Sequence, residues 1–490
     1  MIAWLVWLPA LAGCIAFALR SRGAREALLI GVSFAHLLGA LFVGVRTPDA
    51  TAWQGWLGLD ALGLLFLGVT SALFAVASLY AVGYLRREVV RTRPDFEEGF
   101  AFSNEPEAVF VGCLLLFLAS MTLVTLARHQ GLLWVAVEAT TLATAPLIYF
   151  HRHHRSLEAT WKYLLVCSVG IGLALLGNLF VAVSAAGSGR AESLLLDDLL
   201  AGAVQLRRDW LQAAFLLVLV GYGTKMGLAP MHTWLPDAHS EAPSLVSALL
   251  SGALLNCAFL GILRLVQILG AAGDLGFAGG PLVALGLVSM AVAAVFLVRQ
   301  PDYKRMLAYS SVEHMGVLAL GVGIGGAAAR GALLHAVNHA LAKAMLFLLA
   351  GNLLARFLTK RAADVRGALR VTPVSASLWI AGFLAIAGFP PFGPFLSELS
   401  ILRGALAAGR LAVAASYLAL LGLVFIPMAG LALPMALGSA PPDARRGREP
   451  WSALLPPLLL SAAVLGLGLW IPAPLARILD RAAALLGAAP

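Results

Sequence analysis

The sequence has 490 residues, of which 60% are hydrophobic and only 12% are charged. Water-soluble domains carry about 25% charged residues, so this composition excludes a soluble globular protein. The apolar runs are long and continuous rather than alternating, which excludes a β-barrel and indicates membrane-spanning helices. The net charge is +9, but the basic residues lie mostly in short gaps between apolar runs, which is typical of membrane topology and not of nucleic-acid binding.

Apolar runs of about 20 residues, the length that a helix needs to cross a bilayer, recur along the chain. The sequence therefore predicts an all-α polytopic membrane protein with about fourteen transmembrane helices. The predicted spans are 2–19, 26–45, 58–83, 107–127, 131–150, 158–184, 209–229, 243–263, 280–298, 306–326, 331–355, 371–389, 411–438 and 452–472.

Helix-breaking residues follow two of these spans. Pro230, Pro236 and Pro243 follow the seventh, and Gly388-Phe389-Pro390-Pro391 ends the twelfth. Proline removes a backbone donor, so lipid tolerates such a break only where the freed groups face protein or a polar cavity. Because more apolar sequence follows each break, we predict that helices 7 and 12 are discontinuous.

The spacing of the two broken spans predicts an internal repeat. They lie five spans apart, and an odd number of helices makes the second repeat enter the membrane from the opposite side. Inverted repeats with interrupted helices point to a transport site. We expect N-terminal helices 1–3 in 1–106, a first five-helix repeat in 107–268, a second, inverted repeat in 280–438, and helix 14 with the tail in 452–490.

The basic residues also predict the orientation of the chain. Lys and Arg are more numerous in the odd-numbered gaps, most densely in 86–93, 356–370 and 445–448. Basic loops stay in the cytoplasm, so we expect both termini on the periplasmic side. The four cysteines are far apart and form no CxxC, so we expect no iron–sulfur cluster and no cofactor in this chain.

Ionisable residues lie inside several predicted spans, where they are costly and by default mark ion pathways. Three of them lie on one face of span eleven at positions i, i+4 and i+8. Single buried charges also serve as polar contacts between helices, but their number here favours ion translocation. The predicted proton pathway comprises Glu138, Lys225, His335, His339, Lys343 and Glu398.

A second group of residues is predicted to be accessory. Asp237 and Glu241 lie near the first break, where a solvated or helix-capping role is an equal alternative. Lys162 with Glu158 forms either an i,i+4 interfacial pair or part of a proton inlet. His335 and His339 have a zinc-like spacing without the acid of HExxH, so we expect no metal there. The accessory candidates are Lys162, Asp237, His232, Glu241, Asn256 and Glu313.

Five stretches of the sequence resemble a known family. They are similar to the antiporter-like subunits of respiratory complex I, Mrp-type cation/proton antiporters and membrane-bound hydrogenases. Within this family they are most similar to the hydrogenase-4 component that belongs to formate hydrogenlyase-type complexes. The stretches are Trp134–Thr141, Gly221–Ser251, Asp302–Gly316, His335–Phe347 and Gly388–Leu402.

The resemblance implies a proton-translocating membrane subunit of a modular oxidoreductase that is not itself catalytic. It implies that Glu138 pairs with Lys225, that His335, His339 and Lys343 form a central relay, and that Glu398 ends the pathway. Asn256 stands where complex I relatives usually have a lysine, so a carrier of protons is missing there.

The same resemblance implies the surroundings of the chain. Expected partners are antiporter-like and quinone- or hydrogenase-anchoring membrane subunits and a peripheral cytoplasmic redox arm, in a bacterial cytoplasmic membrane. Two alternatives stay open: a subunit of a cation/proton antiporter without a redox partner, and a subunit of an inorganic-carbon uptake complex. Buried charges would look alike in all three.

Overall fold

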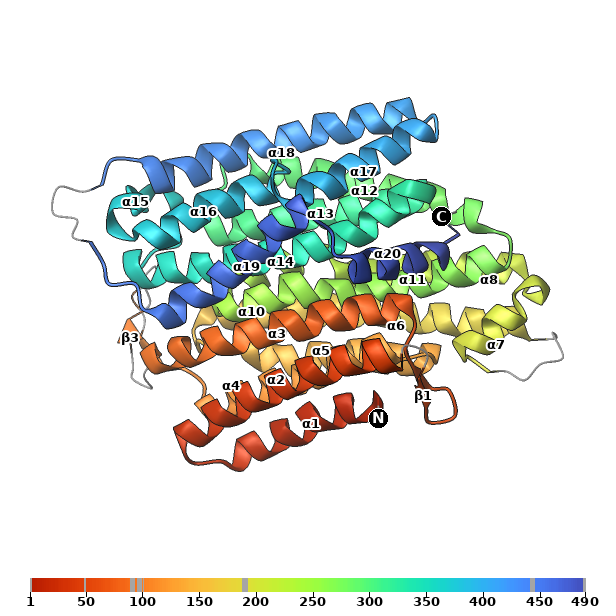
Figure 1. The fold of residues 1–490 in the computed structure, drawn as a ribbon, viewed down its shortest axis with the longest axis horizontal. Coiled ribbons are helices and arrows are strands. Elements are labelled where there is room, and N and C mark those ends of the chain that lie inside the picture. Colours follow the sequence, from red (N-terminus) through yellow and green to blue (C-terminus); the bar gives the residue numbers. More distant parts are fainter. Residues whose placement is uncertain are drawn as a thin grey trace.

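The protein is a bundle of long helices that run side by side (Figure 1). The computed structural model describes residues 2–47, 50–88, 93–94, 99, 101–186, 193–440 and 446–487. Within these ranges the strands are two short hairpins: β1 (Thr51–Ala52) pairs with β2 (Leu57–Gly58), and β3 (Arg93–Pro94) pairs with β4 (Ala101–Phe102).

The helices of the first half are α1 (Ile2–Ala18), α2 (Arg22–Arg46), α3 (Ala61–Arg87), α4 (Glu107–Leu126), α5 (Gln130–Ile148), α6 (His154–Ala185), α7 (Leu196–Ala201), α8 (Arg208–Met226), α9 (Trp234–Glu241), α10 (Ser244–Leu249) and α11 (Leu255–Ala271). Those of the second half are α12 (Leu275–Leu297), α13 (Tyr303–Ile324), α14 (Gly326–Phe357), α15 (Ala368–Val371), α16 (Pro373–Ile386), α17 (Gly393–Ala407), α18 (Leu411–Leu437), α19 (Trp451–Leu469) and α20 (Ala473–Ala484). Single turns of 3₁₀-helix lie at η1 (Ala203–Gln205) and η3 (Ala362–Asp364), and one π-helical turn, η2 (Leu250–Leu254), joins α10 to α11.

The all-α polytopic fold is confirmed. Each of the fourteen predicted spans falls on a helix, and eleven helices in the described ranges are long and apolar enough to cross a membrane. The chain differs from its prediction after the last span, 452–472. Helix α19 ends at Leu469, and the predicted tail contains a further helix, α20, which packs on α3 and α14. At this end of α19, Gly468 lies directly on the backbone of Pro391 and Phe392, an approach that only a residue without a Cβ permits.

The first predicted break lies between α8 and α9. Helix α8 ends at Gly227, which has a left-handed φ of 86°. The freed backbone groups find partners in the protein: Trp234 Nε1 donates to Thr224 O at 2.8 Å, and the N–H of Ala229 donates to Ser289 Oγ at 2.9 Å. A helix can therefore stop inside the bundle without exposing unpaired groups to lipid.

The second predicted break lies between α16 and α17. Gly388 has a φ of 69°, and the side chain of Glu398 occupies the place where a Cβ would stand. Asn338 Nδ2 on α14 donates to Gly393 O at 2.8 Å, so a side chain of α14 binds the backbone of the first turn of α17. Both breaks bring polar side chains against an interrupted helix.

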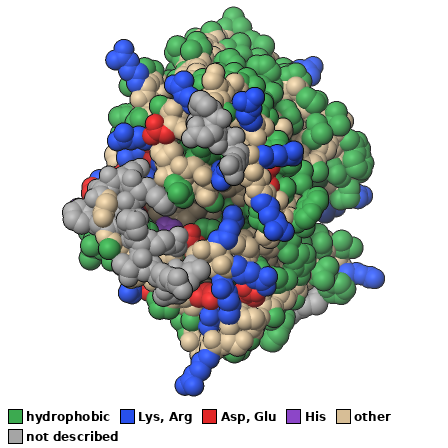
Figure 2. Space-filling view, turned by 90° about the vertical axis from the view of Figure 1, so that its left-hand side faces the viewer, with side chains coloured by type: hydrophobic (Ala, Val, Ile, Leu, Met, Phe, Trp, Pro, Cys, Tyr) green, Lys and Arg blue, Asp and Glu red, His purple; other side chains and the backbone are tan. Residues whose placement is uncertain are grey.

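Charge is unevenly placed on the surface of the bundle. Figure 2 shows Lys, Arg, Asp and Glu side chains gathered on the end of the bundle that carries β3 and α15, with hydrophobic side chains along its flanks. This end holds the odd-numbered gaps in which the sequence concentrates its basic residues.

Candidate functional site

Lys225 forms the centre of a first polar cluster. It lies in the last turn of α8, next to the break, and its side chain is fully buried. Its Nζ donates to Thr141 Oγ1 at 2.8 Å and to Tyr163 OH at 2.6 Å, and stands 4.4 Å from the centre of the Tyr163 ring. The ammonium group is thus held by neutral hydroxyls and an aromatic face.

Glu138 belongs to the same cluster without touching Lys225 directly. Its Oε2 accepts from Thr141 Oγ1 at 3.2 Å, and its Oε1 accepts from Ser168 Oγ at 3.0 Å. Among the residues that the structure describes, no ion pair joins Glu138 to Lys225. The two charges expected to pair are instead connected through the hydroxyl of Thr141, which lies within hydrogen-bond reach of both.

A second polar cluster surrounds α14. His335, His339 and Lys343 share one face of this helix and are fully buried. Lys343 Nζ donates to Leu307 O on α13 at 2.7 Å. Neither ring nitrogen of His339 has a hydrogen-bond partner within the described ranges. Such a buried imidazole retains both nitrogens for exchange with water or protons.

His314, which the sequence pattern did not single out, completes this cluster. Its Nδ1 shares a hydrogen bond of 3.0 Å with His335 Nε2, and its ring centre lies 5.2 Å from that of His339. His335 Nδ1 in turn bonds Ser397 Oγ at 3.0 Å on α17. His314 stands in the stretch DYKRMLAYSSVEHMG, but nothing in its spacing pointed towards α14.

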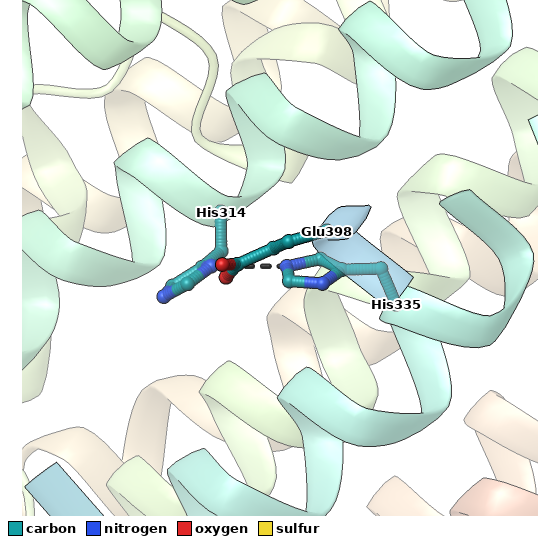
Figure 3. A group of neighbouring side chains, drawn as sticks. All are labelled: His314, His335 and Glu398. Carbon is teal, nitrogen blue, oxygen red and sulfur yellow. Dashed lines mark hydrogen bonds between the residues drawn. The ribbon is translucent and has the colours of Figure 1, made fainter. Parts of the chain in front are cut away.

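Two carboxylates adjoin the histidines. Figure 3 shows the Glu398 side chain pointing towards the rings of His314 and His335. Glu313 and Glu398 both line a cavity of about 280 Å³ between α13, α16, α17 and α18. Tyr417 also lines this cavity, and its hydroxyl has no partner among the described residues.

Polar residues also lie between the two clusters. Ser251, in the π-helical turn η2, bonds Ser311 Oγ on α13 at 2.8 Å. His239 on α9 is buried with its ring stacked on Phe347, 5.1 Å between centres, and neither of its nitrogens has a partner in the described part of the chain. π-Turns recur at functional sites, and this one places a hydroxyl against α13.

The predicted accessory residues do not form one cluster but lie at different contacts between helices. Lys162 Nζ reaches Asp237 at 3.0 Å and Glu158 at 2.6 Å, and Asp237 also binds Arg305, so these charges link α6, α9 and α13 at the bundle surface. Asn256 Nδ2 donates to the backbone oxygen of Gly252 at 3.0 Å. The His232 ring lies edge-on against Phe296 and Tyr309, whose rings stack on each other.

Glu241 forms a small ionic cluster at the end of α9. Lys360 Nζ lies 2.8 Å from its Oε1, and His153 Nε2 lies 3.7 Å from its Oε2. Burial by itself raises the pKa of the Glu241 carboxyl, but the Lys360 ammonium and its hydrogen bond outweigh burial and lower this pKa to about 2. Glu241 is therefore a fixed anion that ties α9 to the loop after α14.

The fold and the buried charges define a class: a polytopic helical membrane protein with polar groups lodged at interrupted helices. Residues 127–423 match the family described as NADH:quinone oxidoreductase/Mrp antiporter, TM. The chain belongs to this family and is one of its antiporter-like membrane subunits.

Individual relatives agree with the family match. The chain is 37% identical over 390 residues to the hydrogenase-4 component F homolog of Methylacidiphilum infernorum, covering 78% of this chain and 79% of that protein. It superposes with a TM-score of 0.88 on a chain of the membrane-bound sulfane sulfur reductase, an archaeal respiratory membrane complex, at 21% identity over 99% and 98% of the two chains. It superposes with a TM-score of 0.80 on a chain of respiratory complex I from Thermus thermophilus, at 26% identity over 99% and 100%.

Proposed function

We propose that this chain translocates protons as a membrane subunit of a modular oxidoreductase complex, with Glu138, Lys225, His335, His339, Lys343 and Glu398 as its pathway. The observation that carries the proposal is the connection from Glu138 to Lys225 through Thr141. A fully buried charged lysine costs several kcal/mol unless it is paired or loses its proton. Its presence beside a helix break therefore favours a role in ion transfer over a role in stability.

The geometry supports a proton step between these two groups. A proton passes from the Lys225 ammonium to Thr141 Oγ1 while the Thr141 hydroxyl proton passes to the Glu138 carboxylate. Lys225 becomes neutral, Glu138 becomes a neutral acid, and Thr141 is unchanged. Both transfers cross ordinary hydrogen bonds, of 2.8 and 3.2 Å, and neither leaves an uncompensated charge behind.

The two polar clusters are assigned to two half-pathways. The first belongs to the repeat 107–268 and the second to the inverted repeat 280–438, with an interrupted helix in each. The chain then lies in the bacterial cytoplasmic membrane with both termini on the periplasmic side, and its basic end faces the cytoplasm.

The surface around Glu138 supports a neighbouring subunit. Glu138 is only half-buried, and its partner Ser168 lies on the exposed face of α6 beside Val169, which is 68% exposed. A carboxylate on a lipid-facing surface at membrane depth is costly, so a second membrane subunit with a polar side chain covers it. Redox chemistry then belongs to a peripheral arm that this chain does not contain.

Thr141→Val tests the proposal, because it removes the connecting hydroxyl and keeps the side-chain shape. In the assembled complex, reconstituted in vesicles with a pH-sensitive dye, proton uptake driven by the redox reaction should fall at least tenfold. Thr140→Val is the matched control, since the Thr140 hydroxyl donates to the Val137 carbonyl of its own helix and, within the described ranges, contacts neither Glu138 nor Lys225 by a hydrogen bond. Full proton uptake by an assembled Thr141→Val complex would remove the connection from the pathway.

A further inference from the structure

Three side chains from three helices meet inside the second polar cluster. His314 on α13, His335 on α14 and Glu398 on α17 each offer one ligand atom, and these atoms lie within 4.8 Å of one another (Figure 3). We propose that they form a site for a divalent transition-metal cation, Zn²⁺ being the best match, and that the bound cation interrupts the proton pathway. The binding stands on geometry alone, whereas the interruption rests on the proposed function.

The donor set and its spacing suit zinc. Two imidazole nitrogens and one carboxylate oxygen, with a fourth position left for water, make a recognised zinc site. Zinc bonds of about 2.0–2.1 Å place tetrahedral donors about 3.3 Å apart. His314 Nδ1 and His335 Nε2 are already 3.0 Å apart, and the Glu398 oxygen lies within 4.8 Å of both, so closing the site requires Glu398 to move by at most about 1.5 Å.

Ser397 holds His335 in the state that a metal needs. The Ser397 hydroxyl donates to Pro394 O at 2.9 Å, so it accepts the proton of His335 Nδ1 at 3.0 Å. That bond leaves the lone pair of His335 Nε2 directed at the other two ligands. A ligating histidine whose second nitrogen donates to a fixed partner is characteristic of real metal sites.

Glu313 is the residue placed to support His314 in the metal-bound state. Without a metal, His314 Nδ1 donates to His335 Nε2, and His314 Nε2 has no hydrogen-bond partner in the described part of the chain. Binding through Nδ1 moves the ring proton to Nε2, which faces Glu313 Oε2 at 4.0 Å. The ring gains no charge by this shift. A movement of about an ångström would bring Nε2 and Glu313 within hydrogen-bond distance, which is the carboxylate–histidine–metal arrangement of many metal sites.

The adjoining cavity offers space for a water molecule as the fourth ligand. It has a volume of about 280 Å³ and is lined by Glu313, Glu398 and Tyr417, whose hydroxyl has no hydrogen-bond partner within the described ranges. That is room for several waters beside the carboxylate.

The ligands are not His335 and His339, the pair whose spacing stands out in the sequence. His314 is the second histidine ligand, and His339 is not a ligand.

Occupation of this site would stop proton transfer through the second cluster. The cation takes the lone pairs of His314 Nδ1 and His335 Nε2 and the Glu398 carboxylate, which are the groups that would otherwise accept protons. Metal and proton therefore compete for the same atoms.

Co²⁺ tests the site because a tetrahedral Co²⁺ ion absorbs visible light and Zn²⁺ displaces it. The full chain, purified with a tag that contains no histidine, should show a tetrahedral Co²⁺ band that one equivalent of Zn²⁺ removes. His314→Gln should weaken binding at least 100-fold and abolish the band. Glu313→Gln should weaken binding about 10- to 100-fold, as removal of a supporting carboxylate does.

His339→Gln is the matched control, since it changes a buried histidine of the same cluster that is not a ligand. The band should persist in it. Absence of the band in the wild-type chain, or its survival in a folded His314→Gln chain, would overturn the metal site. If the band is present but Zn²⁺ leaves redox-driven proton uptake unchanged, the metal site stands and the second cluster drops out of the proposed pathway.

Discussion

Glu138 and Lys225 share one hydroxyl, because Thr141 Oγ1 lies 3.2 Å from the carboxylate and 2.8 Å from the ammonium. A direct ion pair would fix both protonation states, since each charge would stabilise the other. A hydroxyl between them keeps the two charges apart and still offers a path for a proton. The arrangement is suited to changing its protonation, not to holding two helices together.

The first prediction concerns the charge on Glu138. Glu138→Gln keeps the size of the side chain, and its oxygen can still accept from Thr141 while its amide donates to the Ser168 hydroxyl, but it cannot take up a proton. Proton uptake by the reconstituted complex should fall at least tenfold, while the subunits still co-purify. An assembled Glu138→Gln complex with normal uptake would exclude this carboxylate from the pathway.

The second prediction concerns the glycine at the second break. A Cβ on Gly388 would overlap the Glu398 carboxylate, and its φ of 69° is unfavourable for any other residue. Gly388→Ala should lower the free energy of unfolding by about 1–3 kcal/mol and displace Glu398. Thermal unfolding in detergent measures the first effect and Co²⁺ affinity the second.

The control for this variant is Gly172→Ala. Gly172 lies on the exposed face of α6, and an added methyl group there meets no atom within 4 Å. Since alanine favours a helix over glycine, stability should be unchanged or slightly higher. Equal behaviour of the two alanine variants would show that Gly388 is not required by Glu398.

Part of this arrangement can be predicted from sequence and part cannot. Glu138, Lys225 and Lys343 are visible in the sequence because charges are rare in apolar runs, and prolines mark the two interrupted helices. Thr141, Tyr163 and Ser397 carry no such mark, because hydroxyl residues are common in membrane helices as contacts between neighbours. Their role depends on which helices touch, and one sequence does not specify that.

The same limit explains His314 and α20. His314 contacts His335 because α13 packs against α14. The sequence shows only the spacing within α14, which pairs His335 with His339. The last predicted span is followed by a separate helix, α20, because Pro472 and Pro474 stand at a helix N-terminus, where proline is favoured. The five-helix repeats and the order of the pathway residues stay predictions.

The third prediction concerns pH and the Asp60 carboxylate, which lies before α3. Asp60 Oδ1 accepts a hydrogen bond from Arg264 Nη2 at 2.9 Å. It also caps α3 by accepting from the Gly63 N–H at 2.8 Å. Burial alone raises its pKa, but Arg264 and these hydrogen bonds lower the pKa from an ordinary 3.8 to about 2. A lowered folded-state pKa contributes stability above about pH 4, worth about 2 kcal/mol, and this stability is lost as the pH falls from about 4 to 2.

Thermal unfolding of the purified chain at a series of pH values checks this sign. Wild type should exceed Asp60→Asn in stability at pH 5, and the difference should shrink as the pH approaches 2.5. Asp198→Asn, at an exposed carboxylate in α7, should follow wild type throughout. A gap between wild type and Asp60→Asn that stays constant with pH would mean that Asp60 acts by shape and not by charge.

The last prediction compares two residues of the central pathway. Neither ring nitrogen of His339 has a hydrogen-bond partner among the described residues, whereas Asn256 is already bonded to the backbone oxygen of Gly252 and cannot carry a proton. His339→Phe keeps an aromatic ring in place and removes both nitrogens, so proton uptake should fall at least tenfold. Asn256→Ala removes a side chain that at most orients water, so uptake should fall only a few-fold. Both variants are to be measured in vesicles with a pH-sensitive dye after assembly is verified. Loss of uptake in Asn256→Ala together with normal uptake in His339→Phe would mean that protons cross between the two clusters by way of α11, where Asn256 lies, and not along α14.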